Sequence, residues 1–296
     1  MKKQRFGIVG TNFISDRFVE AVNDTSSCEA VAVYSRNQAT ADAFCAKHSI
    51  KQGFTSYIEM LRSDIDAVYI ASPTYCHSSQ AILAMNMGKD VLCEKMLAHN
   101  SAAALEMIKV AKDTGRVLLE ATRPLFDPSF SLIKDATNKI GRVRRVDLGY
   151  SQYSSRYDKF KSGEVLNAFD PAIANSALAD IGIYPLELCL ALFGKPEKTS
   201  GDAVFLDNGF LASGVITLKY PDMLATVTYS KIADGFTPSV IEGECGSVII
   251  DGVNKTKSIT LCMRGGKVEK IDYTPKENNM SYEIEAFARK IGRAHV

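Results

Sequence analysis

Between residues 5 and 120, short apolar runs alternate with helical segments, and this pattern constrains the fold more than any other feature of the chain. The apolar runs lie at residues 5–10, 29–34, 66–71, 90–94 and 116–120, and helical patterns lie at 11–22, 39–47, 76–87 and 100–113. Strands that are apolar nearly throughout predict a parallel sheet with helices on both faces. In such sheets, ligands bind at the carboxyl ends of the strands.

The pattern changes after residue 123. From residue 141 onward, β-prone segments alternate polar and apolar residues, at 143–153, 215–220, 224–231, 247–250 and 258–263. This alternation predicts a mostly antiparallel sheet with one solvated face. A helical insertion is expected around residues 176–193. We therefore predict a parallel α/β domain at residues 1–122 and an α+β domain at residues 123–296.

Composition excludes several classes of partner. The formal net charge of the 296 residues is +1, which favours neither nucleic acid nor an anionic membrane. The most apolar long segment, 172–194, carries Asp180 and Glu187, so no membrane span is predicted. Seven scattered cysteines without a Cys-x-x-Cys pair predict reduced thiols and a cytoplasmic protein. No cluster has metal-ligand spacing, so no metal is expected.

The first strand-to-helix turn has the character of a pyrophosphate site. A dinucleotide fold places glycines there so that the backbone can approach the phosphates at the helix N-terminus. Here the fingerprint is degraded: after Gly10, Asn12 stands at the position of the middle glycine, and Ser15 is the third small residue. Asn tolerates positive φ better than other non-glycine residues, so we expect the turn to form. The predicted cofactor contacts in this turn are Gly10, Thr11, Asn12, Phe13 and Ile14.

The second strand ends in Ser35-Arg36, without the acidic residue that would bind the ribose of NAD. A hydroxyl and a guanidinium suit the 2′-phosphate of NADP(H), which we favour over NAD(H). The alternative is that Arg36 is an ordinary exposed arginine.

Two further strand ends carry candidate residues. Ser72-Pro73-Thr74 follows the strand at 66–71, and the proline ends that strand. His77 begins the next helix, where it either contacts the cofactor or has a packing role. Glu94-Lys95 closes the strand at 90–94, either as a surface ion pair or as part of the site.

These motifs in this order resemble the Gfo/Idh/MocA oxidoreductases over essentially the whole chain. The matching segments are strand-Gly-x-x-Gly at 7–10, Ser-Pro-Thr-x-x-His at 72–77, 88–95 ending in Glu-Lys, 177–186 and 243–247. With tyrosine at position 184, the chain resembles the branch that contains dihydrodiol dehydrogenases, NADP-dependent xylose dehydrogenases and glucose-fructose oxidoreductase. The chain departs from the family where Met96 replaces a proline and Asn175-Ser176 replace glycines.

The resemblance implies that residues 1–122 form a dinucleotide-binding Rossmann domain and residues 123–296 a domain for substrate binding and oligomerisation. It also implies NADP (or NAD), a sugar, polyol or cyclic diol substrate, and Lys95 and Tyr184 as the catalytic pair. Hydride would move between the nicotinamide and a carbinol carbon while Tyr184 transfers the proton. A nearby lysine cation favours the phenolate and stabilises an oxyanion. Glu94 would contact the cofactor ribose or steer Lys95. The alternative for Tyr184 is a half-buried structural tyrosine.

Asp180 and Arg123 are the candidate substrate-binding residues. Asp180 lies four residues before Tyr184, so both face the same way on a continuous helix, although Pro185 opposes that geometry. Arg123 binds substrate or cofactor, or it forms an interdomain salt bridge. A catalytically inactive nucleotide-binding sensor or regulatory protein of the same fold is the alternative function.

The broad second sheet predicts a homodimer or homotetramer, because a one-sided sheet must cover its apolar side. Residues 282–291 have the pattern of an amphipathic helix. The last six residues, 291–296, match one translated frame of a sequencing adapter. We expect the natural chain to continue and these residues to be artefactual.

Overall fold

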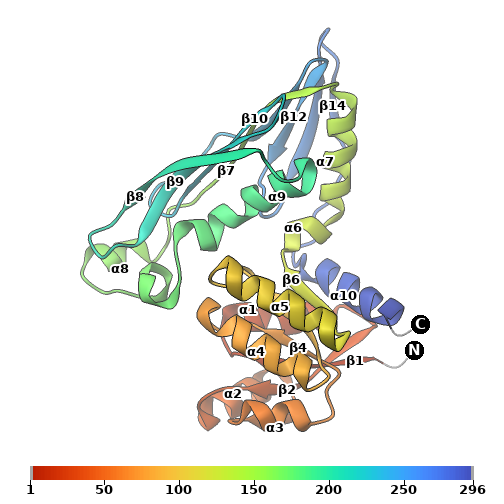
Figure 1. Cartoon of the computed structure of the whole chain (residues 1–296), viewed down its shortest axis with the longest axis vertical. Coiled ribbons are helices and arrows are strands. Elements are labelled where there is room, and N and C mark those ends of the chain that lie inside the picture. The colour runs from red at the N-terminus through yellow and green to blue at the C-terminus, as the bar shows by residue number, and fades with distance from the viewer. Residues whose placement is uncertain (1–2, 295–296) are drawn as a thin grey trace. The chain divides into compact units, whose positions relative to one another are not determined.

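A computed structural model describes the backbone of residues 3–294 and the side chains up to residue 291. The prediction that residues 291–296 are artefactual includes His295 and Val296, which lie outside the described residues. The chain divides into two compact units (Figure 1), of which the first contains residues up to Thr122 and again from Glu277, and the second is Arg123–Lys276.

The first unit is built on a six-stranded sheet in the order β3-β2-β1-β4-β5-β6, and every neighbouring pair is parallel. The strands are β1 (Gln4–Val9), β2 (Cys28–Tyr34), β3 (Gln52–Phe54), β4 (Ala67–Ile70), β5 (Asp90–Glu94) and β6 (Leu118–Ala121). The predicted parallel sheet is confirmed. The strand order reverses between β1 and β4, which is where ligands bind in open α/β sheets.

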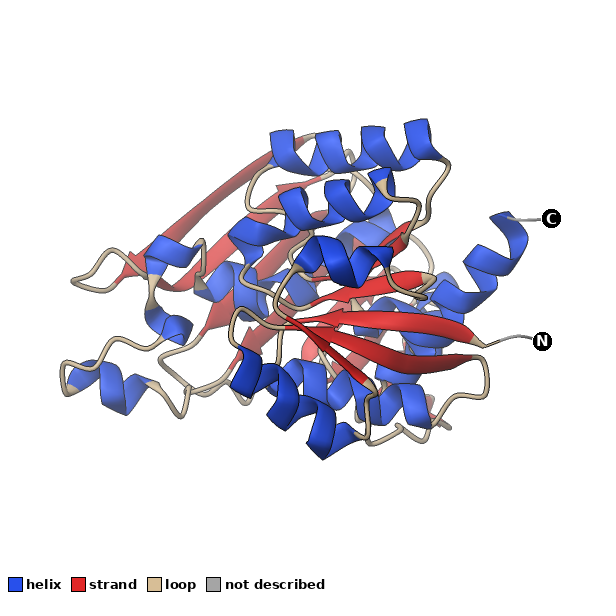
Figure 2. Ribbon diagram, turned by 90° about the horizontal axis from the view of Figure 1, so that it is seen from below, coloured by secondary structure: helices blue, strands red, loops and turns tan. Residues whose placement is uncertain are grey.

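Helices cover both faces of this sheet (Figure 2) and create two separate cores. On one face, α1 (Phe13–Asn23), α2 (Gln38–His48) and α10 (Met280–Ala294) pack on the Phe6 and Ile8 side of β1. On the other face, α3 (Tyr57–Arg62), α4 (Thr74–Asn86) and α5 (Ser101–Thr114) pack on the Val9 side. Burial on both faces explains why these strands are apolar nearly throughout.

The placement of α10 corrects the predicted domain division. Residues 277–296 were expected in the second domain, but Met280, Ile284, Phe287 and Ile291 of α10 belong to the core formed by α1 and the sheet. Asn278 Nδ2 also donates to the carbonyl of Arg17 at 2.8 Å. Periodicity identified the apolar face of this helix, but it carries no information about which distant surface that face covers.

The second unit is built on an eight-stranded sheet in the order β14-β13-β12-β11-β7-β10-β9-β8, in which only β7 and β10 pair in parallel. The strands are β7 (Val143–Ser151), β8 (Lys198–Phe205), β9 (Leu211–Lys219), β10 (Leu224–Ser230), β11 (Ser239–Gly243), β12 (Gly246–Asp251), β13 (Ser258–Met263) and β14 (Val268–Ile271). The predicted large, mostly antiparallel sheet is confirmed.

Helices α7 (Pro128–Lys139) and α9 (Ile183–Phe193) contact this sheet and share one core with it (Figure 1). The second unit also has two shorter helices. α6 (Arg123–Phe126) precedes α7, and α8 (Tyr157–Lys161) follows β7. A π-helical turn, Leu178–Gly182, leads directly into α9. Gly182 permits a close approach there, because a Cβ would lie 2.7 Å from Cγ of Tyr229. Within residues 3–294, no helix combines the length and apolar character that a membrane crossing requires.

Candidate active site

The turn after β1 is built by Gly10 and Asn12. Gly10 has φ +105°, and a Cβ there would lie 2.9 Å from the carbonyl oxygen of Ala71, so glycine is required. Asn12, by contrast, has φ −89°, which corrects the expectation that it uses its tolerance of positive φ. It is instead the N-cap of α1, and its Oδ1 accepts from the amides of Ile14 and Ser15 at 3.0 and 3.2 Å.

The Asn12 side chain also joins two strand ends. Its Nδ2 donates to the carbonyl of Ala71, directly after β4, at 2.7 Å. One amide therefore caps α1 and ties the β1 turn to the β4 turn. The neighbouring Thr11 is half-buried, and Phe13 is 70% exposed at the start of the helix.

The end of β2 presents a basic residue. Ser35 donates its amide to the carbonyl of Phe54, and Asn37 caps α2 by accepting from the amide of Thr40 at 3.2 Å. Arg36 between them is exposed. The side chains at 35–37 include no carboxylate.

The side chain of His77 holds the turn after β4 in place. Ser72 Oγ donates to Gln80 Oε1 at 2.6 Å, Pro73 is the N-cap residue of α4, and Thr74 begins that helix. His77 is buried, with Nε2 2.8 Å from the carbonyl of Ser72 and Nδ1 2.9 Å from the carbonyl of Met96. These contacts favour the packing role: the imidazole fastens the turn after β4 to the turn after β5.

The turn after β5 carries Glu94 and Lys95. Glu94 is buried, and Tyr69 Oη donates to its Oε1 at 2.5 Å, so the carboxylate is part of an internal network rather than a surface ion pair. Lys95 is half-buried, and the Lys95–Met96 peptide bond is cis. The amide of Leu97 donates to Glu120 Oε1 at 2.6 Å, which anchors the segment after Lys95 to β6.

In the second unit, Tyr184 lies on the buried side of α9 and is 5% exposed. Arg123 Nη2 donates to Tyr184 Oη at 2.9 Å, and the guanidinium carbon lies 5.8 Å from the ring centroid. The Tyr150 ring lies 6.1 Å from the Tyr184 ring. The predicted substrate residue Arg123 and the predicted catalytic tyrosine are therefore brought together.

Asp180 lies on the π-helical turn that leads into α9. The helix from Asp180 to Tyr184 is therefore continuous, but its first turn is wider than a turn of α-helix. Its Oδ2 forms an ion pair with Lys231 Nζ at 2.9 Å. Ser176, at a position where glycine was expected, accepts from the amide of Ala179 at 3.0 Å and so supports the start of this turn.

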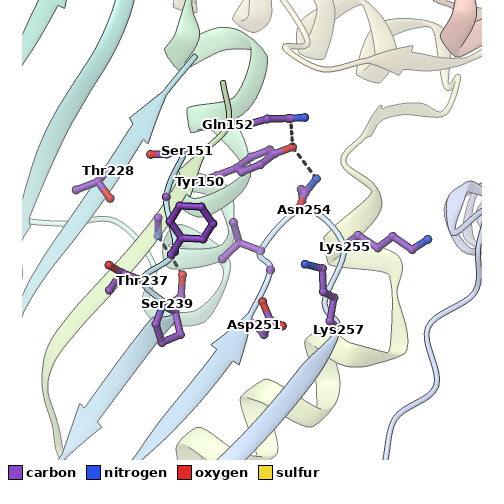
Figure 3. A pocket seen from close by; sticks show the side chains of 16 residues that line it. Tyr150, Ser151, Gln152, Thr228, Thr237, Ser239, Asp251, Asn254, Lys255 and Lys257 are labelled. Atoms are coloured by element: carbon purple, nitrogen blue, oxygen red, sulfur yellow. Dashed lines mark hydrogen bonds between the residues drawn. The ribbon is translucent and has the colours of Figure 1, made fainter. Parts of the chain in front are cut away.

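A pocket of about 730 Å³ lies in the second unit beside Tyr150 (Figure 3). Tyr150 Oη donates to Gln152 Oε1 at 2.9 Å and accepts from Asn254 Nδ2 at 3.0 Å. Hydroxyl groups line much of the wall, from Ser151, Thr228, Thr237 and Ser239. Lys255 and Lys257 contribute positive charge.

The predicted cofactor residues lie at the carboxyl ends of β1, β2, β4 and β5 or in the first turn of the helix that follows, on the same edge of the first sheet. Lys95 and Tyr184 belong to different units, so their pairing stays a prediction. Sequence reasoning missed Tyr69, Tyr150 and Lys231, because nothing in their local patterns distinguishes them from ordinary sheet residues. Among the described residues, no group of three or more His, Cys, Asp or Glu side chains is arranged to hold a metal ion.

Comparisons with known proteins identify the family. The oxidoreductase family model with an NAD-binding Rossmann fold, GFO_IDH_MocA, matches residues 4–122, and the GFO/IDH/MocA C-terminal domain model matches residues 135–249. The chain belongs to the GFO/IDH/MocA family of oxidoreductases.

Individual relatives are similar over most of their length. The chain is 43% identical over 288 residues to scyllo-inositol 2-dehydrogenase (NADP(+)) IolU of Bacillus subtilis (strain 168), covering 97% of this chain and 88% of that protein. It is 32% identical over 254 residues to trans-1,2-dihydrobenzene-1,2-diol dehydrogenase of Danio rerio, covering 82% and 73%. The 3-ketoreductase KijD10 of Actinomadura kijaniata, solved with NADP and TDP-benzene, shares the fold at a TM-score of 0.85 and 21% identity, over 99% and 91% of the two chains.

These findings confirm the predicted class of protein. The chain is an NAD(P)-dependent oxidoreductase that transfers a hydride to or from a carbon bearing a hydroxyl or carbonyl group. The relatives give no support to the alternative of an inactive nucleotide-binding protein.

Proposed function

We propose that this protein interconverts a cyclic polyol or diol and its ketone with NADP(H), using Tyr184 as the proton-transfer group. The observation that carries the proposal is the hydrogen bond from Arg123 to the buried Tyr184 hydroxyl at 2.9 Å. A cationic donor at the tyrosine oxygen supports the phenolate form, and a phenolate can take the proton of a substrate hydroxyl. The named substrates of the two relatives, scyllo-inositol and a dihydrobenzene diol, are both cyclic and both carry vicinal hydroxyls.

In oxidation, the Tyr184 phenolate accepts the hydroxyl proton and becomes a phenol as the carbon–hydrogen bond breaks. The Arg123 guanidinium stabilises negative charge on the phenolic oxygen during that transfer, because a preorganised donor lowers the energy of a developing charge. Lys95 orients the substrate oxygen and stabilises charge on it, and Asp180 accepts a hydrogen bond from a second substrate hydroxyl. The hydroxyl and amide groups around Tyr150 suit a ligand rich in hydroxyl groups.

The residues at the strand ends fit NADP. Gly10 and the N-terminus of α1 would hold the pyrophosphate, and Arg36 would hold the 2′-phosphate. The absence of a carboxylate at 35–37 removes the group that would bind the ribose hydroxyls of NAD and repel a phosphate. When bound, the nicotinamide ring supplies the hydride acceptor or donor.

The test is absorbance at the NADPH wavelength with scyllo-inositol, other inositols and trans-1,2-diols, each with NADP or NAD. We expect turnover with NADP and a cyclic substrate. Tyr184→Phe should lower kcat by about 10²–10⁴-fold, which is the usual contribution of a general acid–base group, and should leave the Kd for NADPH unchanged. Unchanged turnover in both Tyr184→Phe and Lys95→Ala would show that the proton is transferred by other groups.

We further propose that the protein is a cytoplasmic homodimer or homotetramer that associates through the second sheet. Several apolar side chains of this sheet and its loops are exposed, including Val204, Phe205, Leu224 and Phe236. All seven cysteines are free thiols, which suits a reducing compartment. Light scattering coupled to gel filtration will measure the oligomeric state, and a mass of one chain at micromolar concentration would exclude the association.

A further inference from the structure

Lys231 is a buried lysine in the second unit that the proposed mechanism does not use directly. It follows β10, and its side chain is 4% exposed. Its backbone is fixed on both sides, because its amide donates to the carbonyl of Ala212 and its carbonyl accepts from the amide of Ser154, both at 2.9 Å. The origin of the side chain is therefore held firmly at the end of the strand.

The ammonium group lies in an enclosure of complementary groups. Nζ is 2.9 Å from Asp180 Oδ2 and donates to the carbonyl oxygen of Ala168 at 2.6 Å. It also lies over two aromatic rings, 4.9 Å from the centroid of Phe169 and 5.3 Å from that of Phe210. Both phenylalanines are fully buried and pack on each other at 5.0 Å. Ring faces and carbonyl oxygens both favour a cation.

This enclosure makes the position of Asp180 depend on Lys231. Burying an ammonium group costs free energy unless the group is paired and hydrogen-bonded. The ion pair with Lys231 therefore restrains the orientation of the Asp180 carboxylate. The Asp180 side chain remains 40% exposed, so a ligand can reach the carboxylate while Lys231 holds one of its oxygens. The π-helical turn alone does not fix the rotamer of an aspartate that is this exposed.

We propose that Lys231 is a positioning residue that orients the Asp180 carboxylate for a substrate hydroxyl. This inference rests on the proposed substrate-binding role of Asp180. A purely structural role predicts a different behaviour: Lys231 would then only anchor residues 168–169, and its removal would act independently of Asp180.

A double-mutant cycle on the full chain separates the two roles. The variants are Lys231→Met, Asp180→Asn and the double variant, compared by kcat and KM for the cyclic polyol, by Kd for NADPH and by the midpoint of thermal unfolding. We expect Lys231→Met to raise KM and lower kcat/KM by about 10- to 100-fold, as misplaced binding groups do. The Kd for NADPH should stay unchanged. In the Asp180→Asn background, Lys231→Met should have little further effect.

Each outcome has a distinct meaning. If Asp180→Asn leaves kcat/KM unchanged, the proposed role of Asp180 fails, and the positioning role fails with it. If Asp180→Asn is impaired but Lys231→Met lowers kcat/KM equally in both backgrounds, the positioning role alone is overturned. Should Lys231→Met not fold, Lys231→Gln keeps a donor in the enclosure, and the same cycle then decides.

Discussion

At the scale of single residues, the hydrogen bonds of the structure decide roles that residue type alone left open. Asn12 was expected to serve as a substitute for glycine. Instead, its side-chain Oδ1 caps α1, and its Nδ2 donates to the carbonyl of Ala71. Lys231 carried no signal at all, because its partners Ala168 and Asp180 are distant in the sequence. Motifs identify residues that face a ligand, whereas side chains that hold those residues are recognised only from tertiary contacts.

Arg36 tests the proposed choice of cofactor. Arg36→Ala should raise the KM for NADP about 10- to 100-fold, because a hydrogen bond to a charged group contributes roughly 1.5–3 kcal/mol. The KM for NAD should not change, since NAD lacks the 2′-phosphate. Arg62→Ala, which removes an exposed arginine at the end of α3, is the matched control. Equal effects on both cofactors would contradict a phosphate contact.

The buried His77 should make the unfolding free energy of the protein depend on pH. Burial lowers the pKa of His77, and this outweighs the carbonyls of Ser72 and Met96, which raise it. The unfolded state, with a histidine pKa of about 6.5, therefore binds the proton more tightly. The stabilisation is fully present above about pH 6.5 and is lost as the pH falls through the folded-state pKa, by at most about 1.4 kcal/mol per pH unit.

Urea unfolding of the wild type and of His77→Gln between pH 7.5 and 5 will measure this contribution. The difference in unfolding free energy between the two proteins should shrink as the pH falls. A difference that is constant over this range would contradict the protonation of His77 on unfolding. Taking the difference removes other titrating groups, such as Asp16 with its partner His48.

At the scale of elements, the sequence pattern predicted most of the elements of the first unit and fewer of those in the second. The five longer strands of the first sheet and helices α1, α2, α4 and α5 lie within a few residues of the predicted ranges, whereas α3 was missed. Strands β3, β8, β11 and β14 were missed. β3, β11 and β14 have five residues or fewer, and the side chains of β8 are all exposed and therefore show no alternation of burial. Helix α7 was missed too, although Pro128 at its start and Asp127 as its N-cap are helix-start signals.

Two N-caps of the first unit allow a controlled test of the Asn12 contact. Asn100 caps α5 by accepting from the amide of Ala103 at 2.9 Å. Asn100→Ala should cost about 1 kcal/mol of unfolding free energy and leave cofactor binding unchanged. Asn12→Ala should cost more and also weaken NADPH binding, because it releases the link to Ala71. Fluorescence titration with NADPH checks this, and equal Kd values for both variants would contradict it.

At the scale of the whole molecule, the chain leaves the first unit at Thr122 and returns to it at Glu277. The sequence change near residue 123 marked where the second unit begins, because the period of the apolar pattern changes there. The return could not be predicted in the same way, because an amphipathic helix fits any apolar groove of suitable width. The contacts of α10 with α1 and with Phe6 supply that information.

Phe287 measures how much α10 contributes to the first unit. Its ring is fully buried and lies 5.6 Å from that of Phe6. Phe287→Ala should lower the unfolding free energy by about 3–5 kcal/mol, as large-to-small changes in a core do. Leu105→Ala on α5, where the side chain is 65% exposed, should change it by less than about 0.5 kcal/mol. A small effect of Phe287→Ala would show that α10 is dispensable for this core.

The return of α10 to the first unit also sets an order of events on the ribosome. Residues 3–122 emerge first, but the surface of β1 and α1 that α10 covers waits until Arg123–Lys276 has been made. At roughly 5–20 residues per second, that interval lasts on the order of ten to thirty seconds. During synthesis, the nascent cofactor domain therefore exposes an apolar surface that a chaperone can recognise, and it is completed only when translation reaches α10.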